Sequence, residues 1–119
     1  MRENIVRTKS FAFAVRIVKL YQYLCEEKKD FVLSKQLLRS GTSVGAMVRE
    51  AEHAESKSDF KHKMAIAQKE TNETLYWLEL LKETKYLTNE QFESIYSDAV
   101  EIIKLITAII KSTKANINH

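Results

Sequence analysis

The sequence predicts an all-α fold, an antiparallel up-down-up-down four-helix bundle, and three observations carry this prediction. The 119 residues contain no proline and two glycines, far fewer turn residues than a β domain needs. Apolar residues make up 45% of the chain and recur at helical spacing in four segments. Because the connections are short, sequential helices should be antiparallel neighbours around one core, and we expect residues 1–119 to form a single domain.

The first two helices are expected at roughly Lys9–Glu27 and Lys35–Glu55, with Ser34 as the N-cap of the second. The first helix carries two adjacent apolar stripes, where a monomeric bundle needs one. These stripes are Phe11, Val15, Val18 and Leu24, and Phe13, Ile17, Leu20 and Tyr21. The surplus should be buried against another copy of the chain, so we predict a homo-oligomer.

The second helix has an inner stripe that contains a glycine, Gly41, and small residues such as Ser43 and Gly45 lie close by. Glycine costs about 1 kcal/mol relative to alanine in a helix, so its presence needs a reason. One reason is that small residues let a neighbouring backbone approach closely. The alternative is a kink or a break at Gly41.

The third helix is expected at roughly Asp59–Lys85 with Ser58 as its cap, and the fourth begins after Thr88. Thr88 and Gln91 have the spacing of a capping box, in which each side chain bonds the backbone of the other residue. Apolar seams at heptad spacing should face the core. They are Phe60, Met64, Ala67, Thr71, Thr74, Leu78 and Leu81 in the third helix, and Phe92, Ala99, Ile103, Ile106 and Ile110 in the fourth, flanked by Ile95, Ile102 and Ile109.

Composition excludes several classes of protein. Cys25 is the single cysteine, so no intrachain disulfide forms, and we expect a buried thiol. No segment approaches the roughly 18 uninterrupted apolar residues of a membrane span. The first residues are too polar for a signal peptide, so we expect a cytoplasmic protein without a membrane partner.

Motifs for catalysis or metal binding are weak. Glu50 and His53 form an E-x-x-H pair, but a di-iron bundle needs this motif on two helices, and Glu70 with Glu73 lacks a histidine. The segment Gly41–Gly45 lacks the Lys-Ser/Thr ending of a phosphate-binding loop. We therefore expect a non-enzymatic protein without a metal or a cofactor, and charged faces that are solvated or ion-paired.

Arg39 is a candidate for an interhelical ion pair, because its planar guanidinium can bridge carboxylates such as Glu50, Glu70 and Glu73. The alternative is that each is a rim charge facing water. Trp77 is expected in the core near an edge, where its indole N–H finds a partner. The candidate structural or interface residues are Phe11, Phe13, Arg39, Ser43, Glu50, Glu70, Glu73 and Trp77.

A series of motifs covers nearly the whole chain. In order they are Lys9-Ser-Phe-Ala12, Gln36-Leu-Leu-Arg-Ser-x-Thr-Ser-Val-x-Ala46, Glu50-Ala51, Asp59-Phe60 and Ala67-x-Lys-Glu-x-x-Glu-Thr-x-x-Trp-Leu78. Together they resemble bacterial 23S rRNA intervening-sequence proteins, also called S23 ribosomal proteins. One departure is Met47, where the family usually has asparagine.

The resemblance implies a four-helix bundle encoded within sequences that interrupt ribosomal RNA genes or standing alone in a bacterial genome. A related group, the accessory variability proteins of diversity-generating retroelements, forms homopentameric rings that bind a reverse transcriptase and nucleic acid. The resemblance therefore implies a homopentamer as the preferred assembly and RNA, DNA or a nucleic-acid-processing protein as the partner.

Charge placement is consistent with such a partner. The formal net charge is +3, and the predicted topology brings the start of the first helix and the end of the fourth together. Arg7, Lys9, Lys111 and Lys114 lie there and are the candidate nucleic-acid-binding residues. Two alternatives stay open: lysines at helix C-termini that favour the helix dipole, and a purely protein-binding adaptor.

Overall fold

The computed structural model describes the backbone of residues 2–117 and the side chains of residues 2–113, and all regular structure within this part is helical. The helices are α1 (Arg2–Glu26), α2 (Leu33–Ala51), α3 (Lys57–Glu83) and α4 (Asn89–Ile117). The predicted all-α class and its four helices are confirmed for these residues. None of the described helices combines the length and apolar content that a membrane crossing requires.

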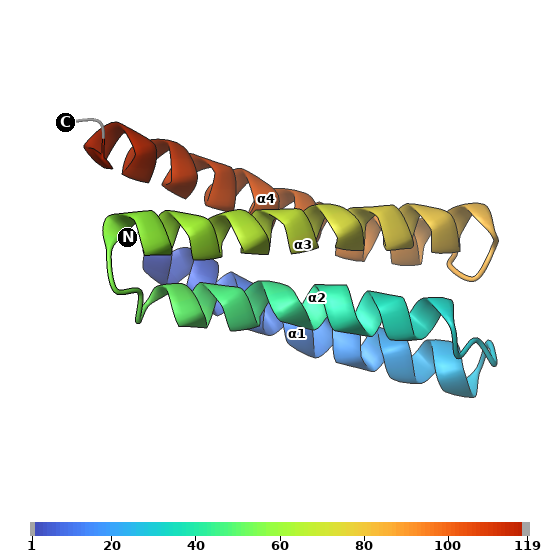
Figure 1. The fold of residues 1–119 in the computed structure, drawn as a ribbon. Helices are drawn as coiled ribbons and strands as arrows, with labels where there is room; N and C mark the ends of the chain where they lie inside the picture. Colours follow the sequence, from blue (N-terminus) through green and yellow to red (C-terminus); the bar gives the residue numbers. More distant parts are fainter. Residues whose placement is uncertain (1, 118–119) are drawn as a thin grey trace.

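The four helices lie side by side in an elongated molecule of 51 × 22 × 19 Å. α1 packs against α2 and α4, and α3 packs against the same two helices. Figure 1 shows the α1–α2 and α3–α4 turns at one end of the molecule. The α2–α3 turn, the start of α1 and the end of α4 lie at the other end, so residues far apart in the sequence meet there (Figure 1).

Each helix contributes one apolar stripe to a shared core, and the predicted seam of α3 is buried from Met64 to Leu81, with Phe60 partly exposed. In α4 most of the predicted seam is buried, together with all three flanking isoleucines, and the prediction is wrong at two positions. Ile103 and Ile110 lie at the edge of the core, because the neighbouring positions face inward. The buried residues of α4 are Phe92, Ile95, Ala99, Ile102, Ile106 and Ile109.

α1 begins well before the predicted Lys9. Its extra turns bury Val6 and continue the stripe that includes Phe13, Ile17 and Leu24. The early turns escaped prediction because Val6 is the single buried residue between residues 2 and 9, too few to form an apolar pattern. The predicted stripe of Phe11, Val15, Val18 and Leu24 faces this core only at Leu24, and Phe11, Val15 and Val18 stay exposed to solvent.

The N-cap position of α2 is Val32, which corrects the prediction of Ser34, and the side chain of Asp30 accepts a backbone N–H of the first turn. The backbone N–H of Ser34 donates to Oδ2 of Asp30 at 2.7 Å, and the Ser34 hydroxyl donates to the Asp30 carbonyl at 2.7 Å. Ser34 thus lies inside the helix, fully buried. α2 ends at Ala51, before the predicted Glu55, and residues 52–56 form the turn to α3.

α3 uses Ser56 as its N-cap, and the prediction of Ser58 was wrong. The Ser56 hydroxyl accepts the backbone N–H of Asp59 at 3.0 Å. The predicted capping box of α4 forms as expected: the Gln91 N–H donates to the Thr88 hydroxyl at 3.1 Å, and the Thr88 N–H donates to Oε1 of Gln91 at 2.9 Å. These bonds satisfy backbone donors that a helix start leaves free.

Gly41 permits close packing and does not break the helix, since α2 runs through it. A Cβ atom there would lie 2.8 Å from Cγ1 and Cγ2 of Ile17 in α1. At Gly45 a Cβ would lie 3.3 Å from the backbone oxygen of Ser10, also in α1. The close neighbour is therefore a helix of the same chain, and the small residues of α2 do not argue for a contact between copies.

Candidate nucleic-acid interface

The predicted basic residues lie where α1 starts and α4 ends (Figure 1). Arg7 and Lys9 stand on α1, and Lys111 is exposed near the end of α4. The side chain of Lys114 lies outside the described residues, so only its helical backbone places it here. We call Arg7, Lys9, Lys111 and Lys114 the basic end.

Two of these cations have acidic partners that the sequence did not reveal. Nε of Arg7 lies 2.9 Å from Oε1 of Glu52, and Nζ of Lys9 lies 2.8 Å from Oε1 of Glu101. The hydrogen bond to Glu101, together with the charge of that carboxylate, raises the pKa of Lys9 above its usual value. Both pairs are solvent-exposed, and such pairs contribute little stability, so a phosphate can compete for the cations.

Arg16 has a structural task. Its Nη1 contacts Oδ2 of Asp98 at 2.6 Å and the carbonyl of Ser94 at 3.1 Å, and its Nη2 donates to the Ser94 hydroxyl at 2.8 Å. The planar guanidinium thereby ties α1 to α4 through three bonds. The charge of Arg16 is therefore paired with Asp98 of the same chain.

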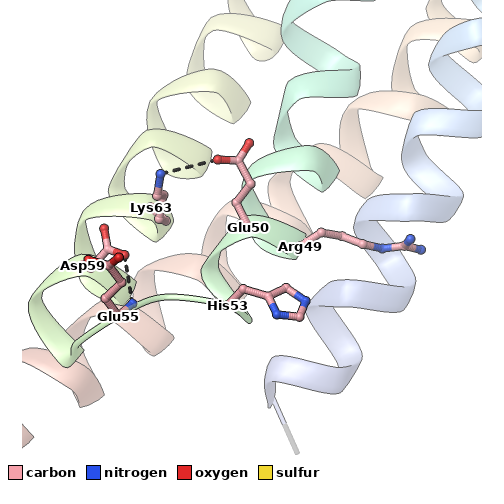
Figure 2. Close-up of a pocket in the computed structure, with 6 residues that line it drawn as sticks. All are labelled: Arg49, Glu50, His53, Glu55, Asp59 and Lys63. Atoms are coloured by element: carbon pink, nitrogen blue, oxygen red, sulfur yellow. Dashed lines mark hydrogen bonds and ion pairs between the residues drawn. The ribbon is translucent and has the colours of Figure 1, made fainter.

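The α2–α3 turn carries a shallow hollow of about 640 Å³, shown in Figure 2. Nζ of Lys63 contacts Oε1 of Glu50 at 3.4 Å, and Asp59 accepts the backbone N–H of Glu55 at 3.1 Å. Arg49 and His53 extend away from Lys63 and Asp59 (Figure 2). The hollow therefore has engaged acids on one side and basic groups on the other.

The E-x-x-H pair does not converge in this hollow. Figure 2 shows the side chains of Glu50 and His53 pointing in different directions. Across the described residues, no group of three or more histidine, cysteine, aspartate or glutamate side chains is arranged to hold a metal ion. Glu50 serves instead in the interhelical pair with Lys63.

Arg39 joins α2 to α3 through two carboxylates. Its Nη1 lies 3.1 Å from Oε2 of Glu70, and its Nη2 contacts Oε2 of Glu73. The same Glu73 oxygen accepts the indole N–H of Trp77 at 2.9 Å, so the indole lies partly buried at the edge of the core. Of the three glutamates considered at the sequence level, Glu70 and Glu73 reach Arg39 and Glu50 does not.

Small hydroxyl side chains line the same contact. The Ser43 hydroxyl donates to the carbonyl of Arg39 at 2.6 Å, within α2. Ser40 and Thr74 are fully buried, and their hydroxyl oxygens lie 2.9 Å apart between α2 and α3. The heptad pattern predicted Thr74 in the core seam, but it did not indicate a polar partner for the Thr74 hydroxyl.

The apolar surface of α1 divides between the two phenylalanines. Phe13 is fully buried in the core, whereas Phe11 is 56% exposed. Val15 and Val18, on the same face as Phe11, are 40% and 38% exposed. The guanidinium carbon of Arg49 lies 5.3 Å from the centroid of the Phe11 aromatic ring, a cation–π contact that the sequence analysis missed.

Comparison with known proteins places these features in a family. A family model described as 23S rRNA-intervening sequence protein matches residues 2–108. The chain belongs to this family. A crystal structure of a protein of unknown function from the S23 ribosomal protein family of Bacteroides thetaiotaomicron is 60% identical, with a TM-score of 0.92 over 93% of this chain and 99% of that chain. No curated protein matches the chain.

The family membership confirms the resemblance inferred from the motifs, and the structure shows where the departure from the family pattern lies. In this 23S rRNA-intervening sequence protein, Met47 is partly buried and packs against the core. The methionine thus adds apolar contact near Ser43 and Glu50, where the family pattern has a polar amide. The residues that a sequence pattern alone did not single out are Arg49 and Arg16.

Proposed function

We propose that this family member is a non-catalytic helical module that self-associates and binds nucleic acid through its basic end. The observation that carries the proposal is the meeting of Arg7, Lys9 and Lys111 at the end where α1 starts and α4 ends. Cations gathered at one end of the molecule attract the phosphate backbone and release its counterions on binding. Assembly of antiparallel bundles into a ring would repeat this end in every copy.

The ion pairs at the basic end do not oppose the proposal. The partners of Arg7 and Lys9 are held in exposed pairs, and a polyanion offers each cation a stronger field than one carboxylate does. Lys111 has no salt bridge among the described residues. We therefore expect Lys111 to be the most accessible of the described cations at this end.

The test is charge reversal at the basic end. Lys111→Glu with Lys114→Glu should weaken binding of single-stranded RNA and duplex DNA at low salt. Each lost contact should reduce the slope of log affinity against log salt by about 0.7 for single strands and about 0.9 for duplex. Adding Arg7→Glu and Lys9→Glu should abolish binding. Lys28→Glu with Lys35→Glu, exposed residues at the opposite end, is the matched control.

A second candidate function, a protein-binding adaptor, is favoured by a different observation. Arg7, Lys9 and Arg16 are all paired with acids of the same chain, while Phe11, Val15 and Val18 expose apolar surface. Equal binding by the parent and the charge-reversed variants, or no binding by either, would establish that this candidate replaces the nucleic-acid proposal.

A further inference from the structure

Phe11 lies in a groove between α1 and α2 that extends to Arg7 of the basic end. The groove has a volume of about 290 Å³, and Arg7, Phe11 and Arg49 stand along it. Its remaining lining consists of small residues that include Ala14, Thr42 and Gly45. Because Phe11 is 56% exposed beside these small side chains, its ring keeps surface for a flat ligand in addition to its contact with Arg49.

Arg49 connects this groove with the hollow at the α2–α3 turn, since it lines both. Its guanidinium lies over the Phe11 aromatic ring, and it has no salt bridge among the described residues. Three acids line the hollow, and none of them forms a salt bridge with Arg49 among the described residues: Glu50 contacts Lys63, Asp59 accepts a backbone N–H, and Glu55 has no salt bridge. Arg49 therefore keeps its charge for a ligand.

The charge of Arg49 decides between two kinds of occupant. A second copy of the chain that covered Phe11 with apolar surface would remove the Arg49 guanidinium from water without giving it a counter-charge, which is costly. A nucleic-acid strand supplies both an aromatic base for the ring and a phosphate for the guanidinium. Bases in a duplex are already stacked, so the ligand must have unpaired bases.

We propose that the α1–α2 groove binds single-stranded nucleic acid, with one unpaired base stacked on Phe11 and the neighbouring phosphate contacted by Arg49. This inference rests on the proposed function and adds to it a ligand class and a base-contacting residue. Arg7, which is paired with Glu52 at the mouth of the same groove, contacts the next phosphate towards the basic end. Stacking requires only the face of a base, so the site accepts RNA and DNA strands.

The experiment measures fluorescence anisotropy of a labelled RNA strand, the DNA strand of the same sequence and the corresponding duplex, using the full chain at low salt. Phe11→Ala should weaken binding of both single strands by about 5- to 100-fold, the range expected for loss of one base–aromatic stack, and leave duplex binding unchanged. Phe11→Trp should retain single-strand binding. Phe31→Ala, which removes a phenylalanine that is 59% exposed at the other end, should have no effect.

Arg49→Gln should lower the single-strand salt slope by about 0.7, as expected for one lost phosphate contact. If Phe11→Ala binds single strands as tightly as the parent, while reversal of Lys111 and Lys114 weakens binding, the groove assignment is wrong and the basic end stands. If Phe11→Ala lowers the assembly mass in light scattering, Phe11 is a subunit contact and the assignment is also wrong. If the parent binds no nucleic acid, the proposed function fails and takes this inference with it.

Discussion

The α2–α3 contact holds more negative than positive charge, because the single guanidinium of Arg39 faces two carboxylates. The side chain of Glu70 is 10% exposed and that of Glu73 is 31% exposed, so loss of the arginine would leave a nearly buried carboxylate without a cation. Breaking a fully buried pair in this way costs about 3–5 kcal/mol, whereas exposed pairs contribute about 1 kcal/mol or less. Arg39 is half exposed, and we expect Arg39→Met to lower the free energy of unfolding by about 1–3 kcal/mol.

Urea denaturation followed by circular dichroism measures this effect, with Lys69→Met, at an exposed position of α3, as the control. Adding Glu70→Gln to Arg39→Met should restore part of the lost stability, because the amide removes the unpaired charge. An Arg39→Met variant as stable as Lys69→Met would mean that water or another group already compensates Glu70.

At this scale the sequence predicted which residue types would meet but not which partners. Glu70 and Glu73 are one helical turn apart beside the α3 seam, so an arginine on the facing helix was expected to reach one of them. Glu50 appeared equally eligible, yet it contacts Lys63. The rotation of α2 about its axis in the packed bundle decides this choice, and a pattern of residue types does not specify that rotation.

Among the elements, the contact between α1 and α2 depends on the missing side chain of Gly41. A methyl group there would overlap two atoms of Ile17, which is fully buried, so that side chain would have to shift within the core. Overpacking of this kind costs about 1–3 kcal/mol, which exceeds the gain of about 1 kcal/mol from the higher helix propensity of alanine. We expect Gly41→Ala to destabilise the protein by up to about 2 kcal/mol.

The sign of this effect should reverse when the overlap is removed. In an Ile17→Ala background, where the overlapping atoms are gone, Gly41→Ala should raise the free energy of unfolding by up to about 1 kcal/mol. Thermal and urea unfolding of the four variants in this cycle measure the coupling. Destabilisation of equal size in both backgrounds would show that Gly41 is needed for a reason other than its distance from Ile17.

Helix existence was predictable because heptad patterns extend over whole segments, but helix ends were not. Each end depends on one or two residues, and Ser56 and Ser58 are equivalent as cap candidates by composition. Glycine usually adopts the left-handed conformation that follows a helix. In this chain Lys29 and Lys85 adopt it instead, with φ of 55° and 67°. A search for glycine or asparagine therefore does not find these ends.

For the whole molecule, the expected topology placed the candidate residues, whereas local sequence did not give their partners. The expected alternation of helix directions was enough to bring Arg7, Lys9 and Lys111 towards one end. The acids that pair with two of them were missed, because Glu52 and Glu101 lie far along the chain from their partners. The Phe11–Arg49 contact was missed for the same reason. The list of candidate cations therefore overstates the free positive charge of the basic end.

Self-association is the property of the whole molecule that its surface predicts most directly. Val15 and Val18 lie one turn apart on α1 and remain 40% and 38% exposed after the described core is complete. Burying such a stripe between copies gains about 25 cal/mol for each Å² removed from water. We expect a stable homo-oligomer at micromolar concentration, with five copies as the number that the family resemblance implies.

Light scattering coupled to size exclusion measures the mass of the parent and of Val15→Gln with Val18→Gln. The double variant should lose assembly mass, since each glutamine would place an amide in an apolar contact that offers it no partner. Val32→Gln, at a valine that is 72% exposed in the α1–α2 turn, should leave the mass unchanged. A parent of monomer mass would refute self-association, whereas a dimer or tetramer would refute only the count of five. If the double variant keeps the mass of the parent, the contact between copies lies on another face, and Val15 and Val18 of α1 stay exposed in the assembly.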